Sequence, residues 1–251
     1  MYRKNMYKEL VRLKTALIAE NLVKWIGDQV SGAGAKGVVF GLSGGIDSAV
    51  VAGLAVRAFP HSTLGIIMPC DSLPEDIEHG GLVADKYGLE LKIIDLLPIY
   101  ESFRNILAGP ADDSPLASAN IKPRLRMVTL YYYAQQLNYL VLGTGNRTEW
   151  EIGYFTKYGD GGVDLEPIGG LVKSQVRDLA VYLEVPEVII HKPPSAGLWE
   201  GQTDEDELGI SYEELDRFIL HGQGSDEARQ RFEKLQKTSQ HKRHLPPFGA
   251  F

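Results

Sequence analysis

The segment that most constrains the fold is Gly41-Leu42-Ser43-Gly44-Gly45-Ile46-Asp47-Ser48. It follows the apolar run 38–40 and precedes the apolar run 49–54. A strand, a turn of small residues and a helix in this order present backbone N–H groups and a helix N-terminus to an anion. Glycines let the backbone approach closely, and the serines add hydroxyl donors. Because no lysine follows the glycines, the segment is not a Walker A loop. It predicts an α/β fold with a phosphate site.

Asp47 is the unusual member of this segment. A carboxylate beside a phosphate repels it unless a cation lies between them, so we expect Asp47 to hold Mg²⁺ against a pyrophosphate. The alternative is a tight turn in which Asp47 starts a helix and is attracted by the helix dipole.

Hydrophobic periodicity extends the α/β prediction to most of the chain. Apolar runs at 38–40, 64–68, 91–94 and 139–142 predict strands, and the sequences at 74–87 and 117–137 predict helices between them. This alternation is typical of a three-layer, Rossmann-like parallel sheet with helices on both faces. If the strand order is 3-2-1-4, the residues after the first and fourth strands, segment 41–48 and Thr144, face each other at the topological switch point.

The remaining pattern is less regular. We expect a single domain over 1–251, with a nucleotide-binding core at about 36–190, a mobile loop at about 191–207 and a helical tail at 211–251. Residues 172–183, 212–220 and 225–238 read as helices. An N-terminal amphipathic helix is expected over 8–30, on the apolar positions Leu10, Leu13, Leu17, Ile18, Leu22, Ile26 and Val30.

Composition excludes several classes of function. The net charge of −7 argues against a general nucleic-acid surface. The single cysteine, Cys70, excludes a disulfide framework and any CxxC site. His241 and His244 have no third partner at a spacing that suits zinc. No leader-like or bilayer-spanning apolar stretch is visible, so we expect a cytoplasmic protein with neither membrane nor nucleic-acid partners.

A few charged residues are candidates for ligand binding. Arg124, in the first turn of a predicted helix, opposes the helix dipole unless an external anion is present; the alternative is a solvated arginine. Glu149, just past the fourth predicted strand, could share a cation with Asp47, or could be an exposed helix glutamate. Lys157 and Lys173 are ordinary lysines unless a phosphate lies near.

The 43–48 signature, Ser-Gly-Gly-x-Asp-Ser, resembles the pyrophosphate-loop family of ATP-using enzymes, which activate a carboxyl or carbonyl carbon as an adenylate. Further along, the chain resembles the ammonia-dependent NAD⁺ synthetases. The resemblance rests on Asn120-Ile121-Lys122-x-Arg124-x-Arg126-Met127, Gly143-Thr144, Gly153-x-Phe155-Thr156-Lys157-x-Gly159-Asp160-Gly161-Gly162-x-Asp164 and His241-Lys242-Arg243.

The resemblance implies three sets of site residues. ATP would be bound by Gly41, Leu42, Ser43, Gly44, Gly45, Ile46, Asp47, Ser48, Thr144, Lys173 and Ser195. Nicotinic acid adenine dinucleotide (deamido-NAD⁺) would be bound by Arg124, Lys157, Asp164, His241 and Lys242. Asp47 and Glu149 would hold Mg²⁺. Lys173, together with the Mg²⁺ held by the catalytic Asp47, would stabilise the charge on the departing pyrophosphate, and Asp164 would accept hydrogen bonds or help to deliver ammonia.

The implied reaction converts deamido-NAD⁺, ATP and ammonia into NAD⁺, AMP and pyrophosphate, in a homodimer whose subunits share the dinucleotide site. Only about 37 residues precede the first predicted strand, too few for a glutaminase module, so we expect ammonia to come from solution or from a separate partner. One alternative is another adenylating enzyme of the family, such as a tRNA-thiolating enzyme, which should carry basic patches and catalytic cysteines. The other is an ATP-binding module without turnover, which should release no pyrophosphate.

Overall fold

The computed structural model describes residues 2–107, 114–194 and 203–249, with side chains from residue 11 onward. Its centre is a sheet of four parallel strands, β1 (Gly37–Gly41), β2 (Thr63–Ile67), β3 (Glu90–Ile93) and β4 (Tyr139–Leu142). The strand order is β3-β2-β1-β4, as predicted. The carboxyl ends of β1 and β4 are therefore neighbours.

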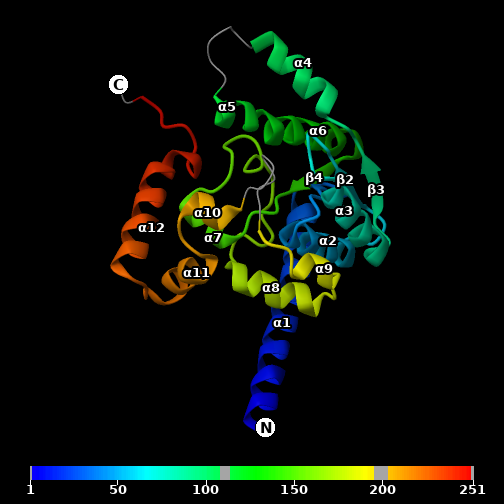
Figure 1. The fold of residues 1–251 in the computed structure, drawn as a ribbon. Coiled ribbons are helices and arrows are strands. Elements are labelled where there is room, and N and C mark those ends of the chain that lie inside the picture. The colour runs from blue at the N-terminus through cyan, green and yellow to red at the C-terminus, as the bar shows by residue number, and fades with distance from the viewer. Residues whose placement is uncertain (1, 108–113, 195–202, 250–251) are drawn as a thin grey trace.

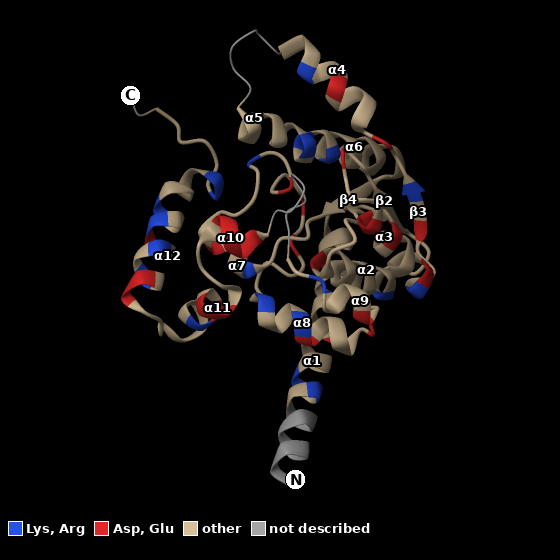
Figure 2. Cartoon of the chain, viewed as in Figure 1, with Lys and Arg blue, Asp and Glu red and all other residues tan. Residues whose placement is uncertain are grey.

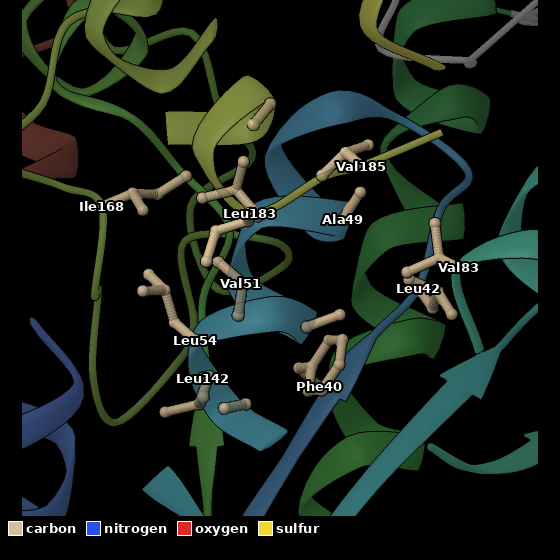
Figure 3. Close-up of a cluster of buried hydrophobic side chains, with 14 of the residues drawn as sticks. Phe40, Leu42, Ala49, Val51, Leu54, Val83, Leu142, Ile168, Leu183 and Val185 are labelled. Atoms are coloured by element: carbon tan, nitrogen blue, oxygen red, sulfur yellow. The ribbon is translucent and has the colours of Figure 1, made fainter. Parts of the chain in front are cut away.

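The two faces of the sheet are covered by different helices (Figure 1). Val39 pairs with Leu64 and Val141 and packs under α6 (Ile121–Leu137). Phe40 points to the other face, against α2 (Ile46–Ala58), in the cluster of Figure 3. Because successive side chains of a strand alternate between faces, these strands bury both sides. The predicted three-layer α/β architecture is confirmed.

Further helices complete the layers. On the α2 side lie α1 (Tyr2–Gly32), α3 (Pro74–Tyr87) and α8 (Lys173–Tyr182), while α4 (Leu97–Leu107) lies against α6. The remaining helices are α5 (Pro115–Ala119), α7 (Arg147–Ile152), α9 (Glu187–Ile190), α10 (Asp204–Leu208), α11 (Tyr212–His221), α12 (Asp226–Thr238) and the 3₁₀ turn η1 (Gln240–Lys242). None of the described helices combines the length and the apolar content needed to cross a bilayer.

The structure differs from the sequence predictions in the N-terminal half. α1 extends beyond 8–30 at both ends, and two of the apolar positions that predicted it, Leu13 and Leu17, are 63% and 58% exposed. The later part of α1 packs on α2 and α8, through Ala19, Ile26 and Val30. The single helix expected at 117–137 is instead α5 and α6, which are separated at position 120.

The C-terminal helices surround a small second core. Leu208, Ile210, Leu215 and Phe232 are buried there against Ile152 of α7. The loop expected over about 191–207 differs at its end, because residues 204–207 belong to α10. The Thr203 hydroxyl caps that helix by accepting the Asp206 N–H at 3.3 Å.

Candidate active site

The loop between β1 and α2 has a backbone that requires glycine. Gly44 has a φ of 76°, and a Cβ placed there would lie 2.3 Å from the main-chain oxygen of Asp76. Gly45 is the N-cap of α2, so the N–H groups of the first helical turn lack intrahelical acceptors. These groups, together with the helix dipole, can receive phosphate oxygens.

Two serines hold this loop in shape. The Ser48 hydroxyl, which is buried, donates to the Gly45 carbonyl oxygen at 2.9 Å and accepts the Ser43 N–H at 3.2 Å. The Ser43 and Ser48 hydroxyl oxygens lie 3.1 Å apart. The loop is thus fixed by its own hydrogen bonds, while Ser43 stays exposed to solvent.

Asp47, Glu149 and Lys173 meet beside the loop, and we call them the carboxylate–lysine cluster. The Lys173 ammonium lies 2.5 Å from Asp47 Oδ2 and 3.3 Å from Glu149 Oε1. The lysine side chain is 3% exposed, and the two carboxylates are 18% and 16% exposed. Residues from α2, α7 and α8 therefore converge at the carboxyl ends of β1 and β4, where ligands bind in open α/β sheets.

The titration behaviour of the cluster follows from burial and charge. The pKa of Glu149 is raised to about 7, because the effect of burial and the smaller one of Asp47 together exceed the opposing effect of Lys173. Burial alone would lower the pKa of Lys173, but the carboxylates of Asp47 and Glu149 outweigh it and raise that pKa. The ammonium thus stays charged and balances two acids.

Asn146 links the two strand ends and was not identified from the sequence. Its side-chain oxygen accepts the Glu149 N–H at 3.1 Å, and Glu149 Oε2 accepts the Asn146 N–H at 3.2 Å, which is a capping box at the start of α7. Its side-chain nitrogen donates to Asp47 Oδ1 at 3.0 Å. The Asn-x-x-Glu spacing could have predicted the capping box, whereas nothing in the sequence indicated the contact with Asp47.

The chemistry of these donors fits Mg²⁺. Asp47 and Glu149 both face one cation, the Lys173 ammonium. Mg²⁺ is usually held by one or two carboxylates, with phosphates and water completing the shell. Within the described ranges no group of three or more His, Cys, Asp or Glu side chains could hold a metal on its own, so an ion here would depend on the nucleotide.

Thr144 lines a small cavity of about 60 Å³ next to the carboxylate–lysine cluster. The cavity is also lined by Gly145, Glu149, Trp150, Tyr154, Phe155, Asp160, Gly161 and Glu166. Glu166, which was not predicted, accepts the Gly145 N–H at 3.1 Å, and burial raises its pKa to about 8. Its carboxyl group fills the space that a Cβ at Gly143 would need.

The expected dinucleotide-binding residues gather on one side of this region. Arg124 donates to the Lys157 carbonyl oxygen at 3.2 Å, and the Lys157 ammonium donates to the His241 carbonyl oxygen at 2.6 Å. Lys242 donates to the carbonyl oxygens of residues 153 and 155. Figure 2 marks basic residues at the start of α6 and in the segment after α12, and the 153–157 segment is hydrogen-bonded to both.

Asp164 and Ser195 stand apart from this group. Asp164 Oδ1 accepts from the Tyr131 hydroxyl at 3.0 Å and Oδ2 accepts the Val141 N–H at 2.8 Å. Within the described part of the chain no hydrogen bond joins Asp164 to the four basic residues. Ser195 lies outside the described residues.

Comparison with known proteins agrees with this geometry. The family model described as NAD synthase matches residues 18–246. The NH(3)-dependent NAD(+) synthetase of Carboxydothermus hydrogenoformans is 54% identical, over 90% of this chain and 94% of the relative.

Two solved structures extend the comparison. The NMN synthetase of Francisella tularensis is 42% identical and superposes with a TM-score of 0.90, covering 94% of this chain and 99% of that one. The NH3-dependent NAD synthetase of Campylobacter jejuni is 31% identical with a TM-score of 0.78, at the same coverage of both chains. The pyrophosphate loop, the carboxylate–lysine cluster and a match over nearly the whole chain lead to one conclusion: the chain belongs to the NAD synthase family.

Proposed function

We propose that the protein is an ammonia-dependent NAD⁺ synthetase, an ATP-dependent ligase that forms a C–N bond. The observation that carries this proposal is the position of Lys173. Its buried ammonium lies between Asp47 and Glu149 beside a preformed anion-binding loop. Such a site suits the triphosphate of ATP and a cation that accompanies it.

The first step activates the substrate carboxylate. A carboxylate is a poor electrophile because its charge repels nucleophiles and oxide is a poor leaving group. One oxygen of the nicotinate carboxylate attacks the α-phosphorus of ATP, the bond between that phosphorus and the bridging oxygen of the β-phosphate breaks, and pyrophosphate leaves. The N–H groups of the loop and the Lys173 ammonium stabilise the charge that builds on the departing group.

The second step forms the amide. Ammonia attacks the carbonyl carbon of the adenylate, the bond to the AMP oxygen breaks, and AMP leaves while the nitrogen loses a proton. Asp47 and Glu149 would hold Mg²⁺, which supplies charge neutralisation for the phosphates when bound. The carboxylates of Asp47 and Glu149 keep the buried Lys173 ammonium charged at the same edge of the sheet.

Arg124, Lys157, His241 and Lys242 would bind the pyridine nucleotide. Arg124 and Lys157 are linked to one another and to His241 by hydrogen bonds, and a dinucleotide brings two phosphates for their cationic groups. Asp164 would accept hydrogen bonds from the substrate or help to deliver ammonia. In the structure its two carboxylate oxygens accept hydrogen bonds from the Tyr131 hydroxyl and the Val141 N–H. Ser195 would complete the ATP site.

A second candidate is amidation of the mononucleotide. The NMN synthetase structure, with 42% identity and a TM-score of 0.90, supports this alternative. The reacting carboxylate is the same in both substrates, so the carboxylate–lysine cluster serves either one. Only contacts to the remote AMP half can distinguish them.

The test is a product assay. Purified protein is incubated with Mg·ATP, ammonium and either deamido-NAD⁺ or nicotinic acid mononucleotide, and the amide, AMP and pyrophosphate are quantified. We expect all three products in equal amounts, with a higher kcat/KM for the dinucleotide. A higher kcat/KM for the mononucleotide would select the second candidate, and ATP binding without either amide would refute both.

We further infer that two copies pair to form a homodimer. α4 buries Tyr100 but leaves Ile99, Phe103, Ile106 and Leu107 at 43–76% exposure, on successive turns of one helix. Apolar faces of this kind are typical of interfaces. Light scattering should give twice the chain mass, and Phe103→Glu with Ile106→Glu should yield monomers. A monomeric wild-type protein would refute the inference.

We also propose that the protein works in the cytoplasm, where thiols stay reduced. Cys70 is free and buried, in accord with that compartment.

A further inference from the structure

α11 lies against both helices that carry the carboxylate–lysine cluster. It packs on α7, which bears Glu149, and on α8, which starts at Lys173. Two of its residues one turn apart, Tyr212 and Asp216, are 1% and 5% exposed. Side chains at positions i and i+4 share one face of a helix, so both point from α11 into the same region.

Tyr212 touches two members of the cluster. Its hydroxyl oxygen lies 3.3 Å from Glu149 Oε1 and 2.8 Å from Asp204 Oδ2. The Lys173 ammonium lies 4.9 Å from the centre of its ring, within the range of a cation–π contact. The ring therefore restricts the movement of the Lys173 ammonium, and the hydroxyl restricts the movement of the Glu149 carboxylate.

Asp216 holds the backbone on which the same two residues sit. Its Oδ1 accepts from the Thr148 hydroxyl at 2.7 Å and from the Lys173 N–H at 3.3 Å, and its Oδ2 accepts the Ser174 N–H at 2.7 Å. These N–H groups belong to the first turn of α8, where a carboxylate is favoured by the helix dipole. Thr148 directly precedes Glu149, so one carboxylate ties the starts of α7 and α8 together.

We propose that Tyr212 and Asp216 are positioning residues that set the separation and direction of Glu149 and Lys173 for Mg·ATP. This role rests on the proposed function, and it would make α11 necessary for the geometry of the active site. It predicts that losing these contacts weakens the use of Mg²⁺ and the chemical step more than it weakens the fold. Residues that orient metal ligands typically change metal affinity or activity by about 10–100-fold when they are replaced.

The test compares Tyr212→Phe and Asp216→Asn with Glu213→Gln. Tyr212→Phe keeps the ring and removes only the hydroxyl. Glu213, on the same helix, is 83% exposed and pairs with Arg217, so its variant controls for a change in charge on α11. Each variant is assayed for kcat, for KM of the pyridine nucleotide, for the Mg²⁺ concentration that gives half-maximal rate, and for Tm. Mg²⁺-dependent binding of a non-hydrolysable ATP analogue is measured separately.

We expect Tyr212→Phe to raise the half-activating Mg²⁺ concentration or lower kcat by about tenfold, with an unchanged KM for the pyridine nucleotide and a Tm near that of the wild type. Asp216→Asn should do the same, and Glu213→Gln should match the wild type. If Tyr212→Phe stays within about twofold of the wild type in kcat, Mg²⁺ activation and analogue binding, the proposal is overturned. Should the wild type form no amide, weaker Mg²⁺-dependent analogue binding by Tyr212→Phe would still support the positioning role, and only the proposed function would fail.

Discussion

Replacing Lys173 by methionine should destabilise the folded protein, because two largely buried carboxylates then lose their positively charged partner. Methionine has similar length and no charge, so Asp47 and Glu149 lose the ammonium at 2.5 and 3.3 Å. Removing one partner of a buried ion pair costs about 3–5 kcal/mol. For a chain of this size that corresponds to a fall in Tm of about 6–20 °C.

The pH dependence of this effect has a defined sign. The folded-state pKa of Glu149 is raised to about 7, above the value of an unfolded glutamate, so its stabilising contribution is present at low pH and is lost as pH rises through 7. Without Lys173 that pKa rises further. The stability difference between Lys173→Met and the wild type should therefore shrink as pH falls from about 8 to about 5.

The assay is thermal unfolding of the wild type, Lys173→Met and a matched control, Lys86→Met. Lys86 pairs with Glu184 at 2.8 Å on the surface, with 37% and 77% of the side chains exposed, so its loss should cost under about 1 kcal/mol. A Tm for Lys173→Met equal to that of Lys86→Met at about pH 8 would refute the reasoning.

Four further changes test other parts of the site. Asp47→Asn should lower kcat by about 100-fold if Asp47 holds Mg²⁺, and near-normal steady-state rates would contradict that role. Gly44→Ala should cost about 1–3 kcal/mol in thermal unfolding and raise the KM for ATP, because of its φ of 76° and the 2.3 Å approach to Asp76; an unaltered Tm would be inconsistent with this. Lys157→Ala should raise the KM for the pyridine nucleotide about tenfold, and an effect confined to ATP would oppose the assignment. Glu166→Gln should flatten the loss of stability between about pH 5 and 8 in urea titrations, because the wild-type pKa of about 8 makes stability fall as pH rises; parallel profiles would exclude this cause.

The sheet and the loop were predictable because their signals are local. Apolar runs between helical segments marked β1 to β4, and α3 has the predicted bounds of 74–87. The approach of Asp47 to Glu149 followed from the strand order and was not visible in either residue alone. The helix expected at 8–30 is present as α1, but apolar spacing alone does not tell which of its turns find a packing partner.

The contacts contributed by the C-terminal helices were not predictable in this way. Tyr212 and Asp216 lie in a polar helix and have no motif, and their role arises only because α11 packs on α7 and α8. Asn146 had a capping signal but no sequence sign of its contact with Asp47. Such pairings depend on tertiary packing, which the local pattern does not encode.

The central claim is that the nucleotide held at the ends of β1 and β4 is attacked at its α-phosphorus by the substrate carboxylate. Its most direct test is one turnover with the pyridine nucleotide labelled with ¹⁸O in the carboxylate, followed by mass spectrometry of the products. The mechanism predicts one labelled oxygen in AMP and none in pyrophosphate. Label in pyrophosphate, or amide formed without label in AMP, would contradict it.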